Sequence, residues 1–148
     1  MIRGLRLIDL DDEYFKLLSQ LSGESRPLDW WEEGERINNF WKEYLDNKYH
    51  STFVYEDILS QEVVGTATII IENKLLHYVS KVAHIEDVVV DKRYRSTGVG
   101  RALIEKCVNE SIKSGCYKVI LDCADNNIPF YERCGFKRHE NCMRIDLC

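Results

Sequence analysis

The sequence is poor in proline and glycine, with 2 prolines and 8 glycines among 148 residues. This scarcity excludes collagen-like repeats and the proline-rich or glycine-rich segments that stay disordered. Hydrophobic residues make up 45% of the chain, enough to bury a core, and we find no internal repeat or linker. Because this length suits one domain, we expect residues 1–148 to fold as a single unit.

The chain also lacks an excess of positive charge. It has 20 Lys plus Arg against 25 Asp plus Glu, which gives a formal net charge of −5. Proteins that bind nucleic acid through bulk charge need a basic surface that releases counterions. The composition therefore disfavours such a partner, and any anionic ligand must be held by local cations.

Long hydrophobic runs are missing as well. No run approaches the roughly 18–20 residues of a membrane span, and the N-terminus loses its apolar character too early for a signal peptide. The 6 cysteines lie in the last third of the chain without a CxxC pair. They could form a disulfide framework or a zinc site, but their long spacing favours buried thiols in a reducing cytoplasm and no metal.

Hydrophobic periodicity predicts a mixed α/β protein. We expect strands at residues 2–8, 51–57, 62–72, 84–90, 118–123 and 138–147. We expect helices after Asp11, after the cap candidate Asp29, after Gly100 and over residues 126–134. The second helix has Trp30, Ile37, Trp41, Tyr44 and Leu45 on its expected inner face. This order predicts three layers, with a mixed sheet between helices.

The segment that follows the fourth expected strand carries the clearest functional signal. It reads Arg95-x-x-Gly98-x-Gly100 just before a helix, and residues 92–101 include four basic residues and no acid. Backbone N–H groups at such a turn, next to the positive end of a helix dipole, can hold a phosphate, and glycine permits close approach. Dinucleotide and Walker spacings do not fit. A plain glycine-containing turn is the alternative for an isolated motif.

Two ordered motifs together resemble the GNAT superfamily of acetyl-CoA-dependent N-acetyltransferases. The turn matches Q/R-x-x-G-x-G/A, and residues 127–136 (NIPFYERCGF) match N-x-x-(x)-F-Y-x-x-x-G-F. Residues 85–90, 115–123 and 131–136 are further similar to the glucosamine-6-phosphate N-acetyltransferase family. The resemblance implies a mostly antiparallel sheet, acetyl-CoA as co-substrate, D-glucosamine 6-phosphate as acceptor, and no metal. Another amine or peptide acceptor, or a non-catalytic acetyl-CoA-binding module, are the alternatives.

The resemblance also implies which residues bind the coenzyme. They are Val88, Val89, Val90, Arg95, Ser96, Thr97, Gly98, Val99, Gly100, Arg101, Asn127 and Tyr131. Backbone groups of the valines would bind pantetheine as an added strand. Tyr131 would protonate the departing thiolate, and core packing is the alternative role for this residue. For Asn127, the alternative to a coenzyme contact is a helix cap. Ser96 replaces a glycine common in relatives, which should matter little if its φ is negative.

Acceptor contacts are implied at the end of the central strand and at scattered positions. Glu86 and Asp87 are expected on opposite faces of the strand, and an ion pair is the alternative role for one of them. Glu86 and Asp122 are expected to take part in the chemistry, and capping of the following helix is the alternative role for Asp122. We assign no single general base. The remaining contacts are Ser22, Lys74, His77, Tyr117, Lys118 and, in place of a family basic residue, Arg144. The resemblance, together with the apolar alternating edge of the last strand, predicts a homodimer whose subunits share the sugar site.

Overall fold

The computed structural model describes residues 1–23 and 30–147, so the expected cap Asp29 lies outside the described residues. Its sheet has five strands in the order β1-β2-β3-β4-β5. They are β1 (Ile2–Gly4), β2 (His50–Glu56), β3 (Val63–Lys74), β4 (Ser80–Val90) and β5 (Cys116–Ile120). All neighbours pair antiparallel except β4 and β5, which are parallel. The expectation of a mixed, mostly antiparallel sheet is confirmed.

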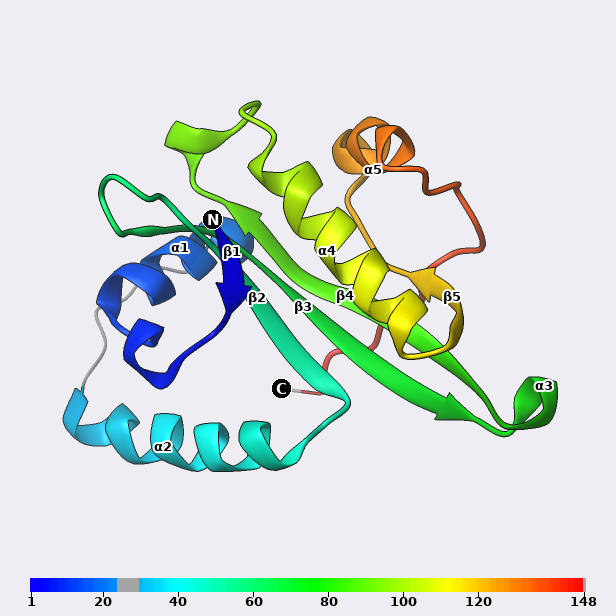
Figure 1. The fold of residues 1–148 in the computed structure, drawn as a ribbon, viewed down its shortest axis with the longest axis horizontal. Coiled ribbons are helices and arrows are strands. Elements are labelled where there is room, and N and C mark those ends of the chain that lie inside the picture. Colours follow the sequence, from blue (N-terminus) through cyan, green and yellow to red (C-terminus); the bar gives the residue numbers. More distant parts are fainter. Residues whose placement is uncertain (24–29, 148) are drawn as a thin grey trace.

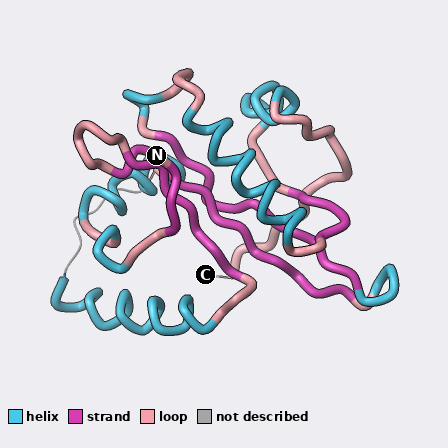
Figure 2. The backbone as a smooth tube through the Cα atoms, in the orientation of Figure 1, coloured by secondary structure: helices cyan, strands magenta, loops and turns pink. Residues whose placement is uncertain are grey.

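Helices cover both faces of this sheet (Figures 1 and 2). The main ones are α1 (Asp12–Ser22), α2 (Trp30–Asp46), α4 (Val99–Lys113) and α5 (Ile128–Arg133), with a short α3 (Leu76–Val79) in the β3–β4 turn. Tyr14 of α1 contacts Thr66, whereas Val99 and Leu103 of α4 lie against the adjacent Gly65. Adjacent strand residues face opposite sides, so α1 and α4 lie on opposite faces and the three-layer prediction is confirmed.

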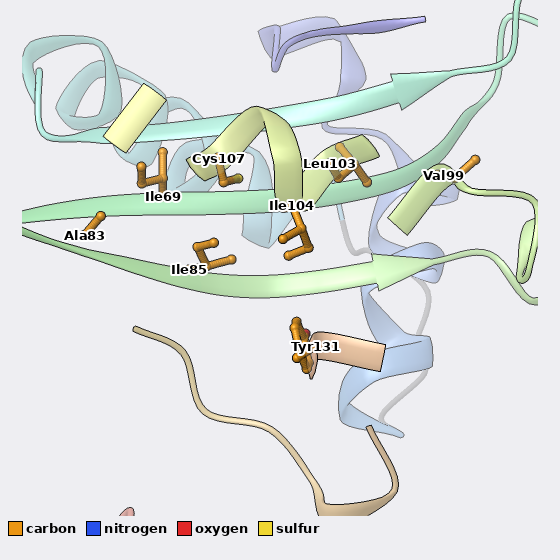
Figure 3. Close-up of a cluster of buried hydrophobic side chains, with 9 residues drawn as sticks. Ile69, Ala83, Ile85, Val99, Leu103, Ile104, Cys107 and Tyr131 are labelled. Carbon is orange, nitrogen blue, oxygen red and sulfur yellow. The ribbon is translucent and has the colours of Figure 1, made fainter. Parts of the chain in front are cut away.

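The main core lies between the sheet and α4 (Figure 3). Its buried members are Ala67, Ile69, Ala83, Ile85, Val99, Leu103, Ile104, Cys107 and Tyr131. Burial raises the pKa of the Cys107 thiol to about 12, so this side chain acts as a small apolar group. The five cysteines within the described residues are all free, as the sequence led us to expect, but the expected burial holds for Cys107 alone. Cys123 and Cys142 are exposed, so for them the prediction of buried thiols is wrong. Within the same residues, no helix has the length and apolarity needed to cross a bilayer.

The expected last strand is wrong. Residues 137–147 form no strand, and the side chains of Met143, Ile145 and Leu147 are almost fully exposed. An alternating apolar pattern becomes a strand only where a neighbouring strand supplies hydrogen bonds, and the pattern does not itself contain that neighbour. Leu45 is likewise exposed, although it was expected on the inner face of α2.

Three other elements differ in extent from the prediction. One is β5, which spans Cys116–Ile120 and not the expected residues 118–123. The first strand ends at Gly4, and residues Leu7–Asp9 form a 3-10 helix in place of its second half. The turn after β3 is shorter than expected because β4 already begins at Ser80. That turn is tight, since three consecutive residues, 77–79, have φ between 54° and 64°.

Candidate active site

One edge of β4 is open along its C-terminal half. β4 pairs with β5 only from Lys81 to His84, whereas its pairing with β3 continues to Val90. Beyond His84, the β5-facing edge of β4 therefore has no strand beside it in the part of the chain that the structure describes. An extended ligand can lie along this edge and bond to its backbone as an added strand.

A β-bulge interrupts β4 in this open half. Glu86 pairs with Thr68 and Val89 with Thr66, so two residues of β4 stand opposite one residue of β3. The bulged Asp87 has φ 50°, in the left-handed region. The bulge turns Asp87 toward the side of the sheet that Glu86 already faces. The expectation that these two acids lie on opposite faces is therefore wrong, because the extra residue breaks the strict alternation of the strand.

A cavity of about 1120 Å³ lies between α1, α2 and this face of the sheet. Its lining includes Ser22, His50, Thr68 and Asp87, so two of the expected acceptor contacts, Ser22 and Asp87, come together here. His50 escaped the sequence analysis because a single histidine in a strand carries no pattern. Burial lowers its pKa, against the opposing charge of Asp87, which favours a neutral imidazole at neutral pH.

Three carboxylates gather where β4 and β5 separate. Burial raises the pKa of Glu86, and the negative charges of Asp87 and then Asp122 raise it further. The C-terminal tail passes the same place, since Cys142 of the tail makes a hydrogen bond with Asp122. This bond raises the pKa of the Cys142 thiol. The structure thus brings together the acids that the sequence assigned to the chemistry, and the protonated form of Glu86 is favoured there.

The turn after β4 has the geometry of an anion site. Gly98, with φ 93°, is the N-cap of α4, and no side chain caps this helix end. The hydrogen bonds of the helix begin at Ala102, whose N–H donates to the carbonyl of Gly98 at 3.0 Å. The N–H groups of residues 99–101 therefore point out of the first turn of the helix, where they can bind phosphate oxygens.

Gly100 has a packing role as well. A Cβ at this position would lie 3.2 Å from Cζ of Phe130 and 3.4 Å from Cγ2 of Val90. The absence of a side chain lets the first turn of α4 lie close to α5 and β4. A side chain here would force the Phe130 ring to shift by a few tenths of an ångström, so glycine favours this helix packing independently of any phosphate.

The positive charge of the turn is smaller than the sequence suggests. Arg93 pairs with Asp91 at 3.1 Å and with Glu62 at 3.4 Å, and Arg101 pairs with Glu105 at 2.9 Å. All three acids lie outside residues 92–101. Of the four basic residues in that range, Lys92 and Arg95 are those with no ion pair among the described residues.

Ser96 departs from expectation. Its φ is 64°, so it occupies the left-handed region that favours glycine, and the substitution of a serine at this position does matter. Neighbouring residues hold the turn in this conformation, because the Thr97 hydroxyl donates to the Tyr94 carbonyl at 2.5 Å.

We expect Ser96→Gly to stabilise the protein. Relief of the left-handed conformation gains about 1 kcal/mol, and the greater freedom of glycine in the unfolded chain offsets part of it, leaving a rise of about 1–2 °C in Tm. Scanning calorimetry measures the change. Ser114→Gly is the control, because Ser114 has φ −79° and glycine there should lower Tm. A lower Tm for Ser96→Gly would contradict the strain.

Tyr131 lies at the open edge of β4 with its ring in the core. The ring contacts Phe130 and Phe136 edge to face, at centroid distances of 4.9 and 6.1 Å. Burial raises its pKa to about 12, with smaller contributions from Cys123 and Cys134. Its hydroxyl makes no hydrogen bond within the described residues. Core packing and an available proton donor are thus both realised in the same residue.

Asn127 and Asp122 keep polar groups near this edge. Asn127 is the residue before α5, but its side chain makes no capping hydrogen bond, so the cap interpretation is not realised. Asp122 follows the end of β5 and is exposed. Both side chains are accessible to a ligand.

The other expected acceptor contacts lie at the far end of the sheet. His77 meets the Tyr117 ring at 4.8 Å, and Lys118 Nζ lies 5.6 Å from the centre of the same ring. Lys74 instead pairs with Glu72. This end of the sheet, next to α3, is opposite the end that carries α1 and Ser22 (Figure 1). One chain does not bring the two sets of residues together.

Arg144 lies in the exposed tail. Its Nε donates to Asp146 Oδ1 at 2.7 Å, and 79% of the Arg144 side chain is exposed. Arg144 was expected in a strand over residues 138–147, two positions before Asp146. The two residues are adjacent, but as an ion pair in an irregular segment, where Asp146 partly neutralises Arg144.

Residues 8–136 match the acetyltransferase (GNAT) family. The chain belongs to this family. It is 38% identical over 134 residues to glucosamine 6-phosphate N-acetyltransferase of Arabidopsis thaliana, covering 90% of this chain and 87% of that protein. The enzyme of that name from Trypanosoma brucei brucei is 49% identical over 85 residues, 57% of this chain and 58% of that protein.

A solved structure agrees with this assignment. The crystal structure of glucosamine-6-phosphate N-acetyltransferase from Arabidopsis thaliana aligns with a TM-score of 0.90 and 33% identity, over 100% of this chain and 98% of that chain. In this GNAT acetyltransferase, the bulge of β4 lies on the open edge of the strand, beside the three carboxylates. The turn before α4 follows at the end of the same strand. Such an arrangement can hold an extended phosphate-bearing acyl carrier on one side and an amine on the other.

Proposed function

We propose that this acetyltransferase transfers the acetyl group of acetyl-CoA to the 2-amino group of D-glucosamine 6-phosphate. The products are coenzyme A and N-acetyl-D-glucosamine 6-phosphate, a precursor for UDP-N-acetylglucosamine, and the transfer is direct within a ternary complex. The observation that carries this proposal is the 38% identity, over 90% of the chain, to a protein with that activity in its name. We place the enzyme in the cytoplasm.

The fold offers a continuous path for acetyl-CoA. The diphosphate binds the free N–H groups at the start of α4, with Arg95 and Lys92 as unpaired cations beside them. Pantetheine extends along the open edge of β4, where the backbone of Val88 and Val90 can bond to it. The thioester then reaches the bulge, next to Tyr131 and the carboxylates, with a backbone N–H near Val88 facing its oxygen.

The chemistry requires a neutral amine and a proton for the leaving thiolate. The amine attacks the thioester carbon, the C–S bond breaks, and Tyr131 donates a hydrogen bond and then a proton to the thiolate. Glu86 accepts the proton lost by the amine, directly or through water, because burial and the neighbouring carboxylates raise its pKa and so favour proton uptake. Asp87 and Asp122 orient the amine, and a proton returns to Tyr131 from solvent.

We further propose a homodimer. His77, Tyr117 and Lys118 lie at the opposite end of the sheet from Ser22, so a second subunit is needed to combine these contacts around one sugar phosphate. The same end exposes large apolar side chains that a partner would cover. They are Leu75, Leu76, Tyr78 and Val79 in the β3–β4 turn. The tail, which passes near Asp122 and not at this end, exposes Met143, Ile145 and Leu147 as well. Light scattering at micromolar concentration tests this, and a monomer would remove the proposal.

A panel of amino sugars with and without a 6-phosphate tests the acceptor. Acetylated products are measured by mass spectrometry, because the protein's own 6 cysteines would react with a thiol dye. We expect turnover to be far faster with glucosamine 6-phosphate than with glucosamine. Equal rates for the two sugars, or faster turnover of polyamines or peptides, would show that the acceptor is another amine.

Lys118→Ala is expected to weaken the binding of the phosphorylated sugar selectively. Loss of one charge-assisted hydrogen bond of about 1.5–3 kcal/mol raises the KM for glucosamine 6-phosphate by roughly 10- to 100-fold. The KM for acetyl-CoA should not change. Lys113→Ala is the control, since Lys113 is an exposed lysine paired with Glu110 on α4. An unchanged KM for the phosphorylated sugar would remove Lys118 from the acceptor site.

A further inference from the structure

Tyr94 lies at the centre of the turn that precedes α4. Its N–H donates to the Asp91 carbonyl at 2.8 Å, and its carbonyl accepts the Thr97 hydroxyl at 2.5 Å. Tyr94 directly precedes Arg95, where the glycine motif begins. The position of its backbone therefore fixes both the entry to the turn and the residues that present N–H groups to a ligand.

The Tyr94 side chain is held from another part of the chain. Its hydroxyl donates to Asp57 Oδ2 at 2.8 Å, across 37 positions of sequence. Asp57 belongs to the β2–β3 turn and is itself fixed, since its Oδ1 accepts the N–H of Leu59 at 2.8 Å. These bonds, first to Leu59 and then to Tyr94, lower the pKa of Asp57, so its carboxylate stays charged and is a strong acceptor at neutral pH.

A second contact holds the turn from the side of α1. The side-chain oxygen of Gln20 accepts the N–H of Lys92 at 3.1 Å, and its nitrogen lies 3.5 Å from Asp91 Oδ2. Gln20 stands two residues before Ser22, which lines the cavity between α1 and α2. The turn is thus fastened to the β2–β3 turn through Tyr94 and to α1 through Lys92.

These contacts matter because the turn includes an unfavourable backbone conformation. Ser96, which is not a glycine, has φ 64°, and such a residue remains in place only where the surroundings determine it. A turn that is already ordered binds its ligand without an additional ordering cost. We propose that Asp57, acting through Tyr94, and Gln20, acting through the Lys92 backbone, are positioning residues for the coenzyme diphosphate. The proposal rests on the proposed function in one respect, that coenzyme A binds at this turn.

Tyr94→Phe and Gln20→Ala test the two contacts separately. Calorimetric titration with coenzyme A is expected to show a Kd raised roughly 5- to 20-fold in Tyr94→Phe, since the lost bond joins a hydroxyl to a charged group. The KM for acetyl-CoA should rise in parallel, whereas kcat and the KM for the acceptor stay near wild type and Tm falls only slightly, since the lost bond also stabilises the free protein. Gln20→Ala should show the same split with a smaller rise, of about 2- to 5-fold, because a neutral bond is lost.

Asp57→Asn and the double variant Asp57→Asn with Tyr94→Phe complete a mutant cycle. The double variant should bind coenzyme A about as weakly as the weaker single variant, because both remove one interaction. Tyr49→Phe is the matched control, since the Tyr49 hydroxyl bonds Asn73 at the opposite end of β3. Its affinity for coenzyme A should equal that of wild type.

Two results would overturn the inference. One is a Kd for coenzyme A in Tyr94→Phe and Gln20→Ala within 2-fold of wild type. The other is a joint fall of kcat, acceptor affinity and Tm, which is the pattern of a general folding defect. Because the titration needs no acceptor, wild-type binding without acetylation of glucosamine 6-phosphate would contradict the proposed acceptor alone. Wild-type protein that binds no coenzyme A would overturn both proposals.

Discussion

Tyr131→Phe is expected to lower kcat by about 10²- to 10⁴-fold, the usual contribution of a general acid. The variant keeps the ring that packs against Phe130 and Phe136 and loses only the hydroxyl, so the KM for acetyl-CoA and Tm should stay near wild type. Because burial raises the pKa of Tyr131 to about 12, the phenol remains protonated from pH 6 to 9. The deficit should therefore be constant over that range when initial rates are measured by mass spectrometry.

Tyr55→Phe provides the matched control for this variant. Tyr55 packs against the same core cluster from β2, outside the open edge of β4. Removal of its hydroxyl should leave kcat unchanged. A kcat of Tyr131→Phe within about 3-fold of wild type would assign Tyr131 to the core alone, with the thiolate leaving unassisted or protonated by water.

The parts of the site that rest on local patterns could be predicted from the sequence. A buried strand, a glycine-containing turn and a helix succeed one another over residues 84–113, and each depends on residues close in the chain. The sequence also predicted the helix that carries Tyr131. It likewise predicted that α4 ends at Gly115, which has φ 75°. Local propensity and packing agree at these positions, so the pattern was sufficient.

The bulge at Asp87 could not be predicted. Residues 85–90 read as an uninterrupted strand, and the extra residue arises from how β4 pairs with β3. The contacts of Asp57 and Gln20 with the turn were missed for the same reason, since they join residues 37 and 72 positions apart. For the tail, the error is the reverse: the sequence predicts a strand that the structure lacks. The alternating pattern is present, but no strand of the same chain lies beside it among the residues that the structure describes.

Glu86→Gln is expected to have opposite effects on activity and stability. The variant cannot accept the proton of the amine, so kcat/KM should fall by about 10²-fold at neutral pH. The acid limb of the wild-type pH profile, which reflects protonation of Glu86 above its ordinary pKa of 4.5, should disappear in the variant. Initial rates over a pH series measure both effects, and an unchanged acid limb would assign the proton to another group.

The stability of the same variant should depend on pH in a defined direction. Since the folded state raises the pKa of Glu86, the folded protein binds more protons than the unfolded chain between the two pKa values, and this carboxylate lowers stability as pH rises through that range. Glu86→Gln should therefore have a higher Tm than wild type at pH 7, and the gain should vanish as pH falls below the ordinary pKa. Glu110→Gln is the control with the opposite sign, because Lys106 and Lys113 lower the pKa of Glu110 and its carboxylate contributes stability at neutral pH that is lost on acidification. A lower Tm for Glu86→Gln at pH 7 would mean that the folded structure stabilises the charged form of Glu86, and such a carboxylate is a poor proton acceptor.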